Sequence, residues 1–117
     1  MGITCLLTGV AGFVGSHLAE QLLVLGHRVV GVDDLSTGWL PNMDSFQAHP
    51  GFSFHQRSVV EPGLLTELVR RHRGIRVIFH LSAVVSVPFS LSHPDETMAI
   101  NYQATLRLLD EACQHGL

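Results

Sequence analysis

The chain contains 117 residues, of which 46% are apolar and 15% charged, and its formal net charge at pH 7 is −3 with the eight histidines neutral. This composition is typical of one soluble globular domain and excludes a disordered or low-complexity chain. Nucleic-acid binding is not expected. All seven basic residues are arginines, and three of them, Arg70, Arg71 and Arg73, lie together at an expected helix end, where the helix dipole explains them.

The predicted elements alternate between short apolar segments and longer amphipathic ones. In chain order they are a strand at 3–7, a helix at 13–25, a strand at 28–32, a turn-rich segment, a short strand at 52–54, a helix at 62–72, a strand at 76–81 and a helix at 94–115. This alternation predicts an α/β fold in which one parallel sheet carries helices on both faces. We expect a single domain over residues 1–117, without internal repeats.

Each of the first two helices is expected to bury one apolar face against the sheet. The predicted faces are Phe13, Val14, Leu18, Leu22 and Leu25 in the first helix, and Leu64, Leu65, Leu68 and Val69 in the second.

Metal sites, disulfides and membrane segments are not expected. Cys5 and Cys113 are too few and too far apart to indicate a disulfide framework or a zinc site. The histidines lack metal-ligand spacing on a common face, and we expect His17 and His80 to be packing or capping residues. The N-terminus lacks the pattern of a signal peptide, and no apolar stretch reaches the roughly 18 residues of a membrane span. We therefore expect a cytoplasmic protein.

Three evenly spaced glycines, Gly9, Gly12 and Gly15, stand between the first predicted strand and the first predicted helix. Glycine in such a loop permits a sharp turn, close approach of the backbone to a pyrophosphate, and tight packing of helix on strand. The amides and dipole of the helix N-terminus then favour an anion. The spacing is G-x-x-G-x-x-G rather than the common G-x-G-x-x-G, so the loop alone is also compatible with a simple tight turn.

Asp33 favours the binding interpretation. It ends the second predicted strand, where a carboxylate can accept hydrogen bonds from the adenosine ribose hydroxyls of a dinucleotide. A carboxylate there would repel a 2′-phosphate, and no arginine follows it directly. The glycine loop and Asp33 together therefore predict NAD rather than NADP.

Four motifs resemble those of the extended short-chain dehydrogenase/reductases. They are TGVAGFVG at 8–15, VDDLSTG at 32–38, HLSA at 80–83 and NYQAT at 101–105. Within that family the chain is most similar to the NAD-dependent epimerases and dehydratases of nucleotide sugars, over residues 3–117. The resemblance implies a Rossmann-type sheet of strand order 3-2-1-4, with NAD across the carboxyl ends of the strands.

The resemblance also implies which residues contact NAD. Gly9, Gly12, Phe13, Val14 and Gly15 would lie along the pyrophosphate, and Asp33 and Asp34 would bind the adenosine ribose beside Ser36, Thr37 and Gly38. Leu81, Ser82, Ala83 and Val85 would run under the cofactor toward the nicotinamide, with Asn101 from the last helix. Ser58 and Val59 stand where the family has an Asp-hydrophobic pair beside adenine. Ser82 and Ala104 replace a usual Ala and Gly, so we expect lower affinity.

The catalytic residues of the family are not found in this chain. The family uses a Ser/Thr and a Tyr-x-x-x-Lys pair, whereas the chain has no lysine and its single Tyr102 is followed four residues later by Leu106. The resemblance places those residues, the fifth strand and the substrate domain beyond Leu117. We therefore expect no catalytic residue and no turnover, and we expect the strand at 76–81 to present an unpaired edge.

Two functions remain open at this point. The chain is either the NAD-binding part of a nucleotide-sugar epimerase or dehydratase, which would act as a homodimer when complete, or a nucleotide-binding or interaction module without turnover.

Overall fold

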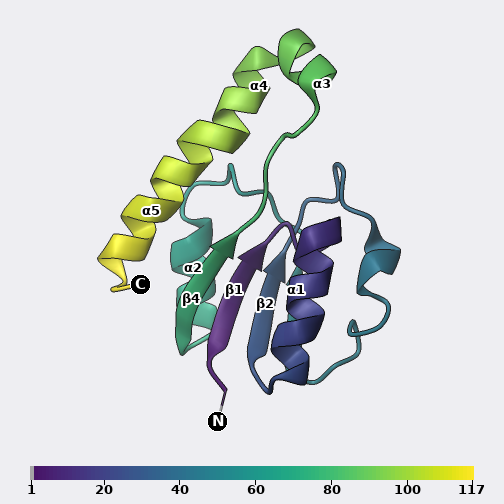
Figure 1. The fold of residues 1–117 in the computed structure, drawn as a ribbon. Coiled ribbons are helices and arrows are strands. Elements are labelled where there is room, and N and C mark those ends of the chain that lie inside the picture. The colour runs from purple at the N-terminus through teal and green to yellow at the C-terminus, as the bar shows by residue number, and fades with distance from the viewer. Residues whose placement is uncertain (1) are drawn as a thin grey trace.

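The computed structural model describes residues 2–117 as a four-stranded parallel sheet with helices on both faces (Figure 1). The strands are β1 (Thr4–Thr8), β2 (Arg28–Val32), β3 (Phe52–His55) and β4 (Ile75–His80). The helices are α1 (Phe13–Val24), α2 (Leu64–Arg71), α3 (Val87–Ser92), α4 (Pro94–Met98) and α5 (Ala104–Gln114), together with a 3₁₀ turn at Leu40–Met43 and a π-helical segment at Ala99–Gln103.

The strand order is β3-β2-β1-β4, with every pair parallel, so the predicted Rossmann-type order is confirmed. Strand residues alternate between the two faces. Leu7 and Val29 pack with α1 in one core cluster, whereas Leu6 and Val30 pack with α2 and α5 in the other. Apolar residues therefore cover both faces of β1 and β2, as expected for strands buried inside an α/β fold.

The predicted apolar face of α1 is wrong in part. Phe13, Val14 and Leu25 are exposed, and the buried residues of the helix are Gly15, Ser16, Ala19 and Leu23. On its buried side, the first turn of the helix lies too close to the loop after β1 for any side chain at Gly15. A Cβ at Gly15 would lie 2.0 Å from the carbonyl oxygen of Gly9. Small residues therefore make this contact, and Leu18 and Leu22 are only partly buried.

The predicted face of α2 is confirmed, because Leu64, Leu65 and Leu68 are buried and Val69 packs against them. The single helix predicted at 94–115 is instead α4, the π-helical segment and α5 in succession, and α3 precedes them unpredicted. Periodicity could not separate these pieces, since a π-helical turn adds one residue without changing the polarity of the sequence.

β4 is an edge strand in the described residues, with β1 as its one neighbour. Figure 1 shows α5 running beside this edge, and Ile78, Leu108 and Ala112 line a groove there. The expected unpaired edge is therefore confirmed for residues 2–117. Within the same range, no helix is long and apolar enough to cross a bilayer.

Candidate cofactor-binding site

The glycine loop connects β1 to α1 at the carboxyl edge of the sheet. Gly9 adopts a left-handed conformation with φ of +75°, which favours glycine, and its N–H donates to the carbonyl of Val32 over 2.8 Å. A Cβ at Gly9 would lie 3.0 Å from the backbone of Leu81 and Ser82. Two of the three glycines, Gly9 and Gly15, are therefore required by close backbone contacts.

The first turn of α1 is open to a ligand. Gly12 is the N-cap and has no side chain to bond the first amides of the helix, which lack carbonyl partners within it. The side chains of Phe13 and Val14 are exposed and leave this end uncovered by other elements. Backbone amides and the helix dipole therefore offer partial positive charge at the place where a pyrophosphate would lie.

The Asp33 carboxylate connects the glycine loop to the segment after β2. Its Oδ2 accepts the Ala11 N–H at 2.9 Å and its Oδ1 accepts the Leu35 N–H at 2.9 Å. The side chain is buried, and a Cβ at Gly38 would lie 2.7 Å from Oδ1, so glycine leaves room for the carboxylate. A carboxylate has about four lone-pair positions, so two remain for further donors.

The other predicted ribose-side residues form the rim of this segment. Asp34 is exposed, and its Oδ1 accepts both the N–H of Ser36 at 3.0 Å and its hydroxyl at 2.7 Å. Both bonds lie within one turn, and they use one of the two oxygens of the Asp34 carboxylate. Thr37 is also exposed and follows directly.

Asn42 holds the glycine loop from outside, a role that the sequence did not indicate. Its Nδ2 donates to the carbonyl of Ala11 over 2.9 Å, and the Trp39 N–H donates to the same oxygen over 3.0 Å. Because Asp33 accepts the Ala11 N–H, both backbone polar groups of Ala11 are bonded by the segment after β2. The only signal for Asn42 was its place in a turn-rich stretch.

Thr8 organises the end of β4. Its buried Oγ1 accepts the N–H groups of Leu81 at 3.0 Å and Ser82 at 3.1 Å. The same oxygen lies 2.7 Å from Nδ1 of His80, whose Nε2 lies 3.1 Å from Oγ1 of Thr105. Since Oγ1 of Thr8 already accepts two bonds, we assign its hydroxyl as the donor to Nδ1 of His80. The neutral imidazole then carries its proton on Nε2 and donates it to Oγ1 of Thr105.

Burial lowers the pKa of His80, and the neutral imidazole satisfies this network. The prediction that His80 is a packing residue is confirmed. His17 is exposed, and its Nδ1 lies 2.7 Å from the carbonyl oxygen of Phe13, one turn earlier in the same helix.

Asn101 positions the segment that follows β4. Its Oδ1 accepts the Val84 N–H at 2.7 Å and its Nδ2 donates to the Val84 carbonyl over 2.9 Å. Both functions of the amide are thus used on the backbone of Val84, so Asn101 shapes the 81–85 segment rather than pointing a free amide at a ligand. Leu81, Ala83 and Val85 are exposed along this segment, and Ser82 is half-buried.

Ser58 and Val59 follow β3, which forms the edge of the sheet opposite β4. Val59 is buried, so its side chain belongs to the interior. The Ser58 N–H donates to Glu61, and its Oγ accepts the N–H of Val60 at 3.3 Å. Ser58 therefore uses its polar groups within its own turn, and Val59 presents no side chain to a ligand.

Apart from Asn101, the predicted cofactor residues all lie in α1 or in the segments that follow the carboxyl ends of the four parallel strands, which share one edge of the sheet. Asn101 lies in the π-helical segment and bonds Val84, in the segment that follows β4. Ligands of open α/β sheets bind at this edge. Among residues 2–117, no group of three His, Cys, Asp or Glu side chains could hold a metal ion.

Comparison with known proteins gives a matching family and several close structures. The family model described as GDP-mannose 4,6 dehydratase matches residues 6–117. UDP-glucose 4-epimerase of Mycolicibacterium smegmatis is 41% identical over 112 residues, which are 96% of this chain and 35% of that protein. UDP-glucuronic acid decarboxylase 1 of Danio rerio is 37% identical over 95% of this chain and 25% of its own length.

Two crystal structures illustrate the similarity of fold. DesIV, a dTDP-glucose 4,6-dehydratase of Streptomyces venezuelae with NAD and TYD bound, has a TM-score of 0.88 and 30% identity over 98% of this chain and 37% of its own. Thermus thermophilus UDP-glucose 4-epimerase in complex with NAD has a TM-score of 0.82 and 32% identity, over 97% of this chain and 35% of its own. The chain thus spans about a quarter to a third of the length of the curated relatives named here.

Proposed function

Because this chain belongs to the GDP-mannose 4,6 dehydratase family, among the NAD-dependent epimerases and dehydratases of the short-chain dehydrogenase/reductases, we propose that it is the NAD-binding part of a nucleotide-sugar epimerase or dehydratase. The relatives named above are an epimerase, a decarboxylase and a dehydratase, so none of them supports a non-catalytic interaction module. The nucleotide-sugar substrate, the homodimer and the cytoplasmic location belong to this proposal for the complete protein.

The contact between Asp33 and Ala11 carries the proposal. One carboxylate holds the glycine loop while keeping lone pairs for the ribose hydroxyls, and the first amides of α1 remain without helical partners. Gly9 and Gly15 supply the close backbone contacts that give the loop this shape, because a Cβ at either position would meet backbone atoms.

The residues of this chain bind and orient the cofactor. Amides at the start of α1 would hold the pyrophosphate, Asp33 would orient the adenosine ribose, and the 81–85 segment, shaped by Thr8 and Asn101, would run beneath the nicotinamide. When bound, NAD supplies a reversible hydride acceptor. The chain has no lysine, so we assign no acid or base to it.

Calorimetric titration with NAD and NADP tests the proposal. Wild-type chain should bind NAD more tightly than NADP, and Asp33→Ala should weaken NAD binding at least tenfold. Asp44→Ala is the control, since that carboxylate is exposed on the same segment and lies outside the predicted cofactor residues. Equal NAD affinity in wild type and Asp33→Ala would refute the ribose assignment.

A further inference from the structure

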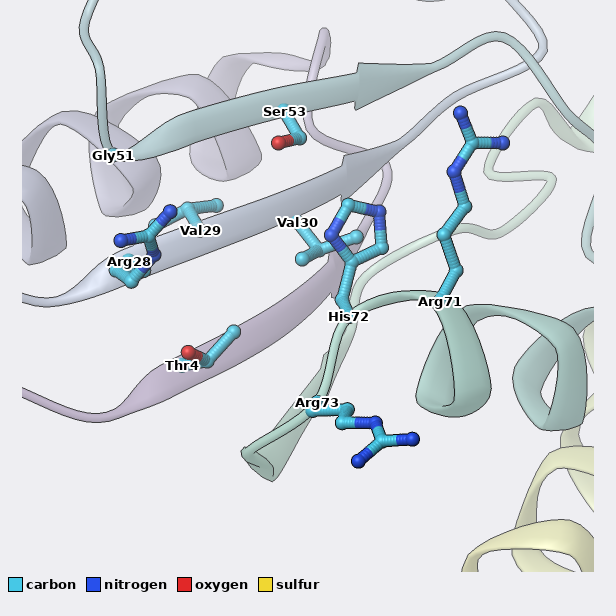
Figure 2. Close-up of a pocket in the computed structure, with 9 residues that line it drawn as sticks. All are labelled: Thr4, Arg28, Val29, Val30, Gly51, Ser53, Arg71, His72 and Arg73. Carbon is cyan, nitrogen blue, oxygen red and sulfur yellow. The ribbon is translucent and has the colours of Figure 1, made fainter.

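A second concave site lies at the opposite edge of the sheet from the glycine loop. A pocket of about 350 Å³ lies among the amino ends of β1, β2 and β3 and the carboxyl end of α2. Figure 2 shows the residues that line it. That volume lies at the small end of the range for small-molecule sites, about 300–1,000 Å³. Since parallel strands separate their two ends, this pocket is distinct from the proposed cofactor site.

The pocket is rich in positive charge and has no negative charge of its own. Arg28, Arg71 and Arg73 line it, and none of its lining residues is acidic. The two ion pairs found within residues 2–117 are both made by Arg57, so none of these three arginines forms one. A favourable interaction with the helix dipole accounts for the arginines at the end of α2. It does not account for the position of Arg28, which lies at the start of β2.

His72 lies among these arginines in Figure 2, with Arg28 to its left, Arg71 to its right and Arg73 below it. Its pKa is lowered by burial and by the charges of Arg71 and Arg28. Its Nε2 lies 2.8 Å from Nε2 of His55, whose pKa is lowered by burial and by the charges of His72 and Arg71 among others. Positive potential from two separate elements therefore converges on one pocket.

We propose that this pocket binds a phosphate group, free or carried as a monoester by a small molecule. Guanidinium forks pair with phosphate oxygens through two parallel hydrogen bonds, and a doubly charged oxyanion would relieve the repulsion among Arg28, Arg71 and Arg73. Thr4 and Ser53 add hydroxyl donors from β1 and β3. The remaining volume accommodates the organic part of a small ester.

Equilibrium dialysis with radiolabelled inorganic phosphate at low ionic strength tests the proposal, because salt screens exposed charges. The variants are Arg28→Gln and the double variant Arg28→Gln/Arg71→Gln; both arginines are exposed, so the fold should be retained. Arg70→Gln is the matched control, since it removes the same charge from the same helix outside the pocket. We expect saturable binding that weakens at least fivefold in the single variant, further in the double variant, and less than twofold in the control.

Competition identifies the source of the phosphate and separates this site from the cofactor site. Displacement of the label by glycerol 3-phosphate at lower concentration than by unlabelled phosphate would assign a phosphomonoester, and the reverse order would assign free phosphate. Saturating NAD should leave the bound label unchanged, whether or not NAD binds. Absence of saturable binding, equal weakening in Arg70→Gln, or displacement of the label by NAD would overturn the proposal.

Discussion

Replacing Asn42 by leucine tests whether the segment after β2 holds the glycine loop in its binding conformation. Leucine keeps the approximate size of the side chain and removes its donor to the Ala11 carbonyl, which now lies 2.9 Å from Nδ2. That carbonyl keeps the Trp39 N–H at 3.0 Å, so the variant leaves no buried acceptor without a partner. The perturbation is therefore one neutral hydrogen bond.

Such a bond contributes about 1 kcal/mol to the free energy of unfolding. For a domain of this size that loss should lower Tm by about 4 °C. If the same bond keeps the loop in the conformation that binds NAD, the NAD affinity should fall about fivefold, the equivalent of about 1 kcal/mol.

Thermal unfolding without ligand and calorimetry with NAD measure the two effects separately. Gln47→Leu is the control, because Gln47 is an exposed amide on the same segment with no side-chain hydrogen bond among residues 2–117. Asn42→Leu with the same Tm and NAD affinity as Gln47→Leu would show that the contact contributes nothing to the loop.

Three further outcomes are expected. Gly15→Ala should lower the free energy of unfolding in urea by about 3 kcal/mol, because its Cβ would lie 2.0 Å from the Gly9 carbonyl oxygen. A stability equal to that of wild type would show that the loop can shift to admit the methyl group without cost. Because burial lowers the pKa of His80 in the folded state, its neutral form should contribute full stability above about pH 6.5, and this contribution should be lost as pH falls below that value. His80→Gln should reduce the slope of stability against pH in this range. The chain should self-associate through the open β4 edge, and light scattering that finds a stable monomer in dilute solution would contradict this.

The order and type of the main elements followed from the sequence alone. Apolar periodicity reflects which residues avoid water, and it indicated the four strands, α1 and α2 nearly to their ends. The glycine loop and Asp33 were also visible, because left-handed backbone and close helix packing require specific residue types in a local pattern. The structure confirms the strand order and places both features at one edge.

Tertiary structure alone decided which side chains reach one another. Asn42 meets Ala11 across 31 positions, and Thr8 meets Leu81 across 73 positions. The burial of α1 also differed from its apolar pattern, because distance to the sheet, rather than polarity, selects Gly15 and Ala19 for the contact face. Hydrogen bonds form only within about 3 Å, so such contacts depend on how distant elements pack, which local periodicity does not encode.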